Sequence, residues 1–575
     1  MKTTNLIIWV FSAVLIISCN KDYLNRFPED SPNSATYYTS ADQLTLAINA
    51  AYNNLSYQQD GFPYQMQLEG TSDIIWQRPA TDAQTIGLGQ HTSSTTMIKT
   101  LWTQFYSGIG KCNMLLDNMA KAKSVTPAAQ YTRIDGEARF LRAYYYGNLI
   151  ALFGDVPLVD KSIGAAESFL PRTPQADVLN FIFRDLDSAT AKLPLSYTGT
   201  DIGRATKTSA MAFKARMALY YAKWDIAAAS SKAVMDLAYH SLYPNYRNLF
   251  MFAGENSKET IFNFDYKLTV RTTATPINNQ ARNAGGYSGL VPTRALADSY
   301  ECTDGLPIDK SPLYTTADPF KNRDPRMRQT LLGEGDTWFG TGGITFNMTF
   351  HPDSATCTKF TPAPLAKIAN QEVTNAFSSY SGFIMKKYLD PIDLAVSNQS
   401  ELAFMLIRYA EVLLTYAEAK IELNQIDATV LDAINQVRAR GYGVTVAQTT
   451  LYPAITTTNQ TALRTIIRRE RKIELAGEGL RLFDIRRWKI AEKVMNGILF
   501  GKALNKSIYY SLPMPTLDEN ASPDYSSFNS LVGVVGNFKI MDNPRVFKPF
   551  NYLWPIPQVE IDVNKNPGFV QNTGY

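Results

Sequence analysis

Apolar residues recur every three to four positions through most of the first 240 residues, which is the spacing of amphipathic helices. In residues 41–57 the apolar positions share one helical face, and Ser40 stands where an N-cap residue is expected. The same periodicity predicts further helices over residues 97–123, 131–153, 175–193, 206–221 and 225–238. A turn of two or three residues around Lys223 and Trp224 separates the last two, so they are predicted to form an antiparallel helix hairpin.

The helical periodicity stops after Tyr243. Residues 243–400 are rich in Asn, Thr, Gly, Pro and Asp, and they hold only short strand-like pieces, at 260–266 and 383–388. A long irregular stretch inside a compact protein usually carries function. We therefore expect residues 243–400 to form a ligand-binding insertion between two helical parts of the chain.

Helical periodicity then returns, and it predicts helices over residues 402–423, 427–439, 461–476 and 480–495. Short antiparallel helix pairs of about 34 residues are typical of tetratricopeptide-like (TPR-like) repeats, although no pair carries the full consensus pattern. The predicted fold is therefore mostly α. It has a TPR-like scaffold of helical pairs over residues 41–242 and 401–498, with a long loop-rich insertion containing short strands. Residues 499–575 are expected to form a loop-rich C-terminal tail packed on the scaffold.

The N-terminus has the pattern of a secretory signal. Lys2 precedes an apolar run over residues 6–17, which is too short to cross a bilayer as a helix of about 20 residues. The run ends in the tetrapeptide IISC, which resembles a bacterial lipobox. We expect residues 1–18 to be a lipoprotein signal peptide, Cys19 to be lipidated, and residues 19–40 to act as a polar leash. An ordinary signal peptide with an accidental cysteine is the alternative.

Composition narrows the classes of function. The 575 residues hold 56 Lys and Arg against 52 Asp and Glu, a formal charge of +4, whereas nucleic-acid binders normally show a basic domain or stripe. The chain has 3 His, which is few for a His-rich metal centre. We expect no metal and no cofactor. The chain is 12% aromatic but only 19% charged, below the usual ~25%. This balance suggests aromatic surface beyond what the core needs and favours capture of an uncharged ligand.

Several strings resemble one protein family. They are GEARFLRA at 136–143, FGDVPLV at 153–159, CTDG at 302–305, NRDPR at 322–326, RRERKIELAGEGLRLFDIRRW at 468–488 and WPIPQVEIDVNKNPGFVQNTGY at 554–575. Together with Cys19 as the start of the mature chain, their order and spacing resemble the SusD/RagB family of Bacteroidetes outer-membrane lipoproteins. The resemblance covers essentially the whole chain.

The resemblance implies a helical fold with four TPR-like units. It implies a lipid-anchored protein of the outer membrane, facing the cell exterior, that caps a SusC-like TonB-dependent transporter. The implied task is to capture a glycan on a surface built from loops and to hand it to that transporter. Capture of peptides, on the RagB side of the family, is the nearest alternative. Two further alternatives are a lipid-anchored glycan hydrolase and a TPR adaptor whose concave face binds another protein's peptide, but we expect a binding protein rather than an enzyme.

Three glutamates invite a catalytic interpretation. Glu470, Glu474 and Glu478 are spaced four residues apart, and a glycosidase needs two carboxyl groups, one as acid and one as nucleophile or base. However, Glu470 and Glu474 share a helical face with apolar residues such as Ile466 and Ile473. We therefore expect them to be structural, partly buried and paired with arginines from the next helix.

Three cysteines remain after Cys19. Cys112 lies in helical phase with apolar neighbours and is predicted to be a core thiol. Cys302 and Cys357 either bridge the middle region or stay as free thiols, because an odd number of cysteines cannot pair fully.

Two loops combine aromatic rings with planar polar groups, which is the mixture that a sugar needs. Sugar rings present C–H faces that lie flat on Trp or Tyr, and their hydroxyls require hydrogen-bond partners. Loops 69–91 and 279–346 supply the candidate ligand contacts, which are Asp73, Trp76, Arg78, Arg282, Tyr287, Trp338 and Phe339. Packing inside the scaffold is the alternative for Trp76 and Trp338, because tryptophan is commonly buried.

Overall fold

The computed structural model describes residues 37–78, 80–395 and 397–575. The predicted signal peptide, the lipidation site at Cys19 and most of the predicted leash lie outside these residues. Within the described ranges, no helix combines the length and the apolar character that a membrane-spanning segment requires.

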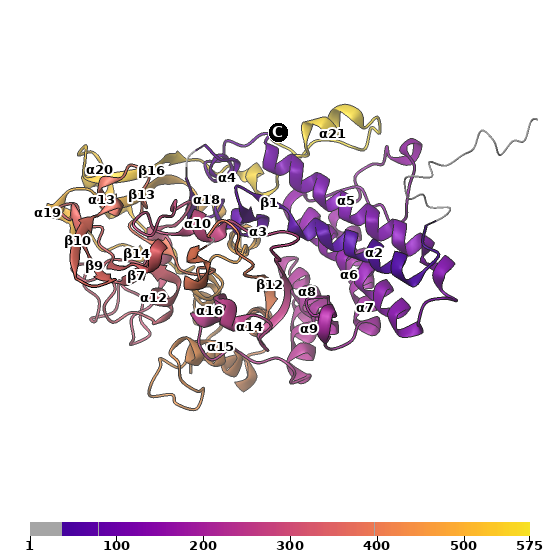
Figure 1. Cartoon of the computed structure of the whole chain (residues 1–575), viewed down its shortest axis with the longest axis horizontal. Coiled ribbons are helices and arrows are strands. Elements are labelled where there is room, and N and C mark those ends of the chain that lie inside the picture. The colour runs from indigo at the N-terminus through magenta and orange to yellow at the C-terminus, as the bar shows by residue number, and fades with distance from the viewer. Residues whose placement is uncertain (1–36, 79, 396) are drawn as a thin grey trace, which may run out of the picture.

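The N-terminal part of the scaffold is a row of helices. They are α2 (Ala41–Tyr52), α5 (Thr96–Asn118), α6 (Ala128–Phe153), α7 (Gln175–Lys192), α8 (Lys207–Tyr220) and α9 (Trp224–Asp236). Each packs against the next, and together they form the helical half of the molecule on the right of Figure 1. The helices predicted in this part are confirmed. Ser40 caps α2 as expected, because its hydroxyl accepts a hydrogen bond of 3.2 Å from the Gln43 amide.

The C-terminal part of the scaffold corrects two predicted helices. Its helices are α14 (Tyr409–Glu422), α15 (Ala428–Gly441), α16 (Gln460–Glu474) and α17 (Arg481–Arg487). The helix predicted over 402–423 is wrong in its first part, where strand β12 (Phe404–Arg408) pairs antiparallel with β4 (Thr260–Phe264). The helix predicted over 480–495 breaks after α17 at Lys489, whose φ of +56° is left-handed, and α18 (Ala491–Val494) follows.

Strand β12 forms because its backbone has a partner and its side chains are buried on both faces. The run Phe404–Arg408 is buried at every position. A run this short, with apolar residues at four consecutive positions, does not show by its periodicity whether it is helix or strand. Backbone pairing with strand β4 favours the strand.

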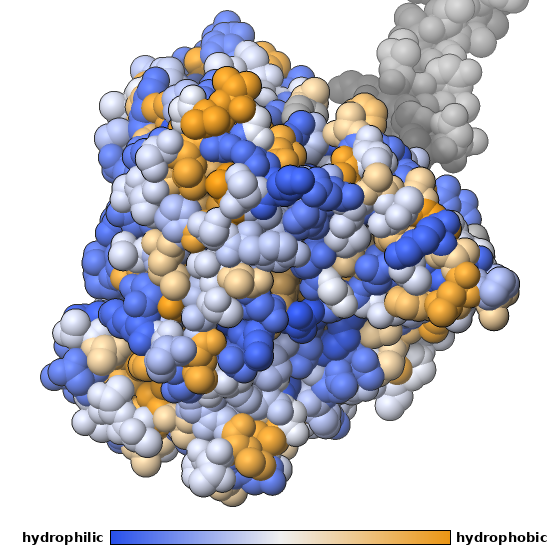
Figure 2. Space-filling view, turned by 90° about the vertical axis from the view of Figure 1, so that its left-hand side faces the viewer, coloured by the Kyte–Doolittle hydropathy of each residue, from blue (hydrophilic) through white to orange (hydrophobic). Residues whose placement is uncertain are grey.

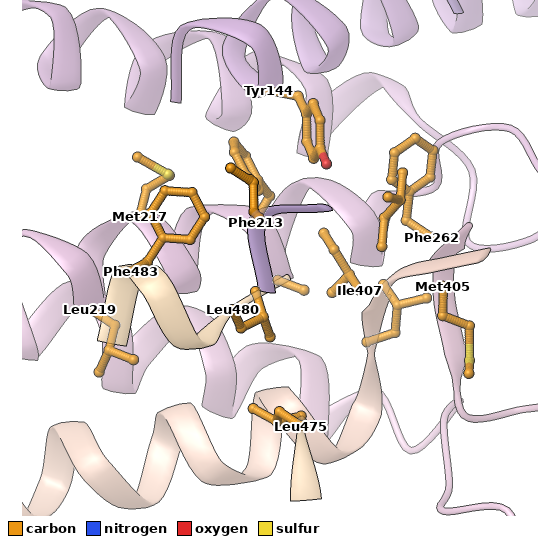
Figure 3. Close-up of a cluster of buried hydrophobic side chains, with 14 of the residues drawn as sticks. Tyr144, Phe213, Met217, Leu219, Phe262, Met405, Ile407, Leu475, Leu480 and Phe483 are labelled. Carbon is orange, nitrogen blue, oxygen red and sulfur yellow. The ribbon is translucent and has the colours of Figure 1, made fainter. Parts of the chain in front are cut away.

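One hydrophobic core joins the two parts of the scaffold. Figure 3 shows Tyr144 of α6 and Phe213 of α8 beside Phe262 of β4, with Ile407 of β12 and Phe483 of α17 in the same cluster. Residues from chain positions more than 300 apart therefore fold as one unit.

The insertion consists of loops and short strands, on the left of Figure 1. A four-stranded antiparallel sheet has the order β10-β9-β8-β7, from β7 (Thr337–Phe339), β8 (Thr345–Asn347), β9 (Thr356–Thr361) and β10 (Ala366–Ala369). The two strands predicted here are confirmed in shorter form, as β4 and as β11 (Ile384–Met385), which pairs with β6 (Leu331–Leu332). Figure 2 shows this end of the molecule, where hydrophobic residues lie in small groups among hydrophilic ones.

The tail returns to the helical half. Strand β13 (Gly497–Ala503) pairs with β16 (Phe538–Arg545), and the chain then runs to α21 (Gln558–Val563) beside α5 at the top of Figure 1. The Trp554 amide donates to the Leu152 carbonyl at 2.7 Å, so the tail is fixed to the end of α6.

Candidate functional site

The glutamates that resembled a glycosidase pair are buried structural groups. Glu474 accepts hydrogen bonds from Arg408 at 2.8 Å, from Arg326 at 3.1 Å and from Arg440. Glu470 likewise pairs with Arg326 at 2.9 Å. The structural prediction is confirmed, but the expected origin of the arginines is wrong. They come from α12 (Arg326–Thr330), β12 and α15 rather than from the helix after α16.

The electrostatics of Glu474 do not suit an acid catalyst. Burial by itself would raise the pKa of this carboxyl group, but Arg440, Arg408 and Arg326 outweigh it and hold the pKa well below its usual range. A carboxyl group that stays ionised and fully paired has no proton to give to a leaving group.

The three cysteines of the described residues are buried as well. Cys112, Cys302 and Cys357 are all buried free thiols, so Cys302 and Cys357 do not form the disulfide that was one of their two interpretations. Burial raises the pKa of Cys112 to about 12, which makes it an unreactive core thiol as expected. The described residues contain no group of three or more His, Cys, Asp or Glu placed to hold a metal ion.

Asp73 and Trp76 lie inside the molecule. Arg481 donates to both carboxylate oxygens of Asp73, at 2.7 and 2.8 Å. Trp76 belongs to β3 (Ile75–Gln77), which pairs with β5 (Leu290–Pro292), and its fully buried ring stacks under Tyr380 at 5.2 Å between centroids. Neither side chain faces solvent, and the Trp76 ring supports Tyr380 above it.

Trp338 is buried as well. Its indole N–H donates to Gln280 Oε1 at 2.8 Å, and its ring stacks with half-buried Phe339 at 4.1 Å between centroids. The cationic groups of Arg247 and Lys386 lie 5.9 and 5.6 Å from the Trp338 ring. The pairing of β7 with β8 turns this ring inward, so Trp338 serves the insertion's own core.

The other predicted residues come together at the surface. The pairing of β3 with β5 brings the two predicted loops side by side, and the Arg78 amide donates to the Gly289 carbonyl at 3.1 Å. The Arg78 guanidinium donates to the carbonyls of Tyr287 and Phe377, the latter at 2.8 Å, and lies 5.1 Å from the Phe377 ring centroid. Tyr287 is 48% exposed and Phe377 is 62% exposed.

We call this cluster the Arg78–Phe377 surface, and it consists of Arg78, Arg282, Tyr287, Phe377 and Tyr380. Arg282 donates to the Gly286 carbonyl at 2.6 Å and lies 5.7 Å from the Tyr287 ring. Burial lowers the pKa of Arg78, and the positive charge of Arg282 lowers it further. The surface therefore presents two rings at its rim and a dense local positive charge beside them.

A tight turn holds Tyr287 outward. A Cβ atom on Gly286 would overlap Gln280, so only glycine fits there. The Tyr287 amide donates to the Ile277 carbonyl at 2.8 Å, which fixes the backbone on the other side of the turn. The ring is thus held in place before any ligand arrives, which reduces the entropy cost of binding.

Sequence reasoning missed Phe377 and Tyr380. They lie about one hundred residues after the second predicted loop begins, on either side of the polar pair Ser378-Ser379. The rule that selected the two predicted loops, rings among small polar residues, would also have selected this run.

The surface can hold a flat, hydroxyl-rich ligand. Its exposed rings offer apolar faces, and the arginines retain N–H donors beyond those that bind the carbonyls. None of its five residues carries a carboxyl group, which is the usual acid and nucleophile of glycoside hydrolysis.

Comparisons with known proteins give the same family over both halves of the chain. Residues 250–575 match the SusD family, and residues 22–219 match a family described as starch-binding associating with outer membrane. SusD-like protein P25 of Formosa agariphila is 24% identical over 549 residues, covering 91% of this chain and 98% of that protein. A SusD-like carbohydrate binding protein from Bacteroides fragilis has a TM-score of 0.78 at 29% identity, covering 93% of this chain and 100% of that chain. A laminarin binding SusD-like protein shares the fold, with a TM-score of 0.66 at 19% identity over 94% of this chain and 100% of that one.

Proposed function

The chain belongs to the SusD family, and we propose that it captures glycans at the cell surface on the Arg78–Phe377 surface. The observation that supports this most is the fixed arrangement of two exposed rings, Tyr287 and Phe377, around the guanidinium of Arg78. The Bacteroides fragilis relative is named as a carbohydrate binding protein, which supports a glycan as the ligand.

The chemistry of the surface favours a sugar over a peptide. A sugar ring stacked on Tyr287 or Phe377 gains apolar contact while its hydroxyls accept hydrogen bonds from Arg78 and Arg282. Peptides captured as extended strands bind through main-chain hydrogen bonds to a sheet edge. The groups that this surface presents are instead side-chain rings and guanidinium groups.

Affinity gels that contain polysaccharides test the proposal. The mature chain is run in native gels cast with laminarin, starch or xylan, and in a gel without glycan. We expect retardation in at least one glycan gel, and loss of it in Tyr287→Ala and Phe377→Ala. Phe169→Ala, which removes a 42% exposed ring outside this surface, is the matched control and should migrate like wild type.

Two results would decide against glycan capture. Absence of retardation in every glycan gel, with peptides captured instead, would favour the RagB-like alternative. Release of reducing ends from a retained glycan would favour the lipid-anchored hydrolase.

We further propose that Cys19 carries the lipid anchor and that the glycan passes to a SusC-like TonB-dependent transporter. The lipobox-like sequence and the description of the family matched by residues 22–219 as associating with outer membrane support this. Because two or more acyl chains anchor a protein stably, Cys19→Ala is expected to move the protein from the membrane fraction to the soluble fraction. A variant that stays in the membrane fraction would refute the anchor, and failure to co-purify a SusC-like protein from detergent extracts would refute the partner.

A further inference from the structure

A cavity of about 480 Å³ opens in the loop-rich part of the molecule. Its walls come from α11 (Arg294–Ser299), from residues 314–320, from residues 381–383 and from the chain around α19 (Lys506–Tyr509). It shares no lining residue with the Arg78–Phe377 surface. Its volume lies in the range of about 300–1,000 Å³ that is typical of small-ligand sites.

Aromatic side chains form one side of the cavity. Tyr510 is 46% exposed, and its ring stacks on His351 at 5.4 Å and meets the Tyr509 ring edge-on at 4.9 Å. The Tyr509 hydroxyl donates to Glu334 Oε2 at 3.1 Å. These contacts hold the Tyr510 ring in place while leaving nearly half of it open to a ligand.

Most cationic groups that line the cavity already have partners. Arg323 donates to the carbonyls of Ala297 and Tyr300, at 2.7 and 2.8 Å. Arg328 pairs with Asp336 at 2.6 Å. Lys502 reaches the Glu372 carbonyl at 2.5 Å. These contacts hold the three groups in the wall, although the Nε–H of Arg323 has no acceptor.

Arg294 differs from these cations. In the part of the chain that the structure describes, its guanidinium forms no hydrogen bond or ion pair, and its buried Nε–H has no acceptor. The ring of Phe528 lies 5.8 Å from the Arg294 guanidinium, and the Asp298 carboxylate is close enough to interact with its charge. Asp298, in the same helix, is engaged by the Tyr525 hydroxyl at 2.9 Å. Four cationic side chains and three carboxylates line the cavity, and Asp336, the partner of Arg328, balances the fourth cation from outside the lining.

We propose that this cavity is a second ligand site that takes an acidic sugar, a hexuronic acid, with its carboxylate on Arg294 and its ring on Tyr510. A guanidinium matches a carboxylate with two parallel hydrogen bonds, and an unpartnered buried donor is costly unless a ligand satisfies it. The saccharide identity rests on the proposed function, whereas the anion preference rests on Arg294 alone. The site would let one protein recognise glycans that combine neutral and acidic sugars.

Titration with simple sugars tests this site. Binding of glucuronate and of glucose to the mature chain is followed by ligand-observed NMR. We expect glucuronate to bind more tightly than glucose, and Arg294→Gln to weaken glucuronate binding by about tenfold or more. Tyr510→Ala should weaken both sugars. Arg184→Gln, an exposed arginine of α7, is the matched control and should change neither.

The readouts separate this proposal from the first. The double variant Tyr287→Ala/Phe377→Ala should lose retardation in glycan gels yet keep glucuronate binding. Equal affinities for glucuronate and glucose, or full glucuronate affinity in a folded Arg294→Gln variant, would overturn the acidic-sugar site while leaving the Arg78–Phe377 surface intact. Displacement of glucuronate by equimolar acetate would reduce the cavity to an anion site and would also overturn it.

Discussion

At the scale of single residues, buried charge contributes to the fold rather than to catalysis. Glu474 is fully buried and is the shared partner of Arg326, Arg408 and Arg440, which come from three different elements. It therefore ties the insertion, strand β12 and helix α15 to α16. The spacing of the glutamates resembles a catalytic pair, but their carboxyl groups are used for pairing with these arginines.

We expect Glu474→Gln to destabilise the protein by about 3–5 kcal/mol, because removing one member of a buried charge network leaves the others unpaired. Urea unfolding followed by circular dichroism measures this. Glu492→Gln, at an exposed position of α18, is the control and should stay within about 0.5 kcal/mol of wild type. A neutral effect of Glu474→Gln would show that the network is dispensable.

His91 makes stability depend on pH. Burial, helped by the charge of Arg486, lowers the pKa of His91 to about 3, and its Nε2 lies 2.7 Å from the Tyr575 hydroxyl. The unfolded chain takes up a proton near pH 6.5 and the folded chain does not. This contribution to stability is therefore present above pH 6.5 and is lost as pH falls toward 3.

Between pH 7.5 and pH 5, we expect His91 to account for a loss of about 2 kcal/mol. His91→Gln should remove that component, so the variant loses less stability on acidification than wild type does. The free energy of unfolding at both pH values measures the difference. Parallel pH profiles for the two proteins would contradict the assignment.

Single residues of the ligand surface were partly predictable. Arg78, Arg282 and Tyr287 could be selected from composition alone, because rings and planar polar groups gather in their loops. The burial of Trp76 and Trp338 could not, because it depends on which strands pair, and pairing inside an irregular stretch is not encoded locally. Exposure of a ring is decided by partners that lie far away in the sequence.

At the scale of elements, helices followed from the sequence and short strands did not. Helices α5 to α9 lie close to their predicted ranges because their apolar stripes repeat over many turns. The pattern over residues 402–423 predicts a single helix, because the apolar positions of strand β12 continue the helical spacing of α14. Only the distant strand β4 distinguishes the two outcomes.

Helix α5 contains two glycines, one packed against α6 and one facing open space. A Cβ atom on Gly108 would overlap the ring of Tyr145, which is held by a hydrogen bond of 2.7 Å from its hydroxyl to the Ala51 carbonyl. A Cβ atom on Gly110 meets no atom within 4 Å. Substitution at Gly108 therefore reports on packing, whereas substitution at Gly110 reports on helix propensity.

We expect Gly108→Ala to destabilise the protein by about 1–3 kcal/mol through overpacking. Gly110→Ala should stabilise it by about 0.5–1 kcal/mol, because alanine is the better helix former. Thermal unfolding measures both. Shifts of Tm in the same direction would contradict the packing of α5 on α6.

At the scale of the whole molecule, the proposed binding sites lie apart from the helical pairs. The helical pairs form one continuous frame, whereas the Arg78–Phe377 surface and the cavity beside Tyr510 are built from loops, short elements of the insertion and the tail. The resemblance to the SusD/RagB family and the mostly helical scaffold were both predictable from the sequence. The assembly of a surface from loops near residues 78, 287 and 377 required the structure, because no local pattern links them.

We propose that the Arg78–Phe377 surface, rather than any other part of the molecule, captures the glycan. Isothermal titration of the mature chain with the glycan that retards it most in affinity gels tests this directly. The expected result is that the folded double variant Tyr287→Ala/Phe377→Ala loses about tenfold or more in affinity, because the loss of stacked rings at a binding centre costs at least about 1.4 kcal/mol. Unchanged affinity in that variant, with its Tm equal to that of wild type, would contradict the account.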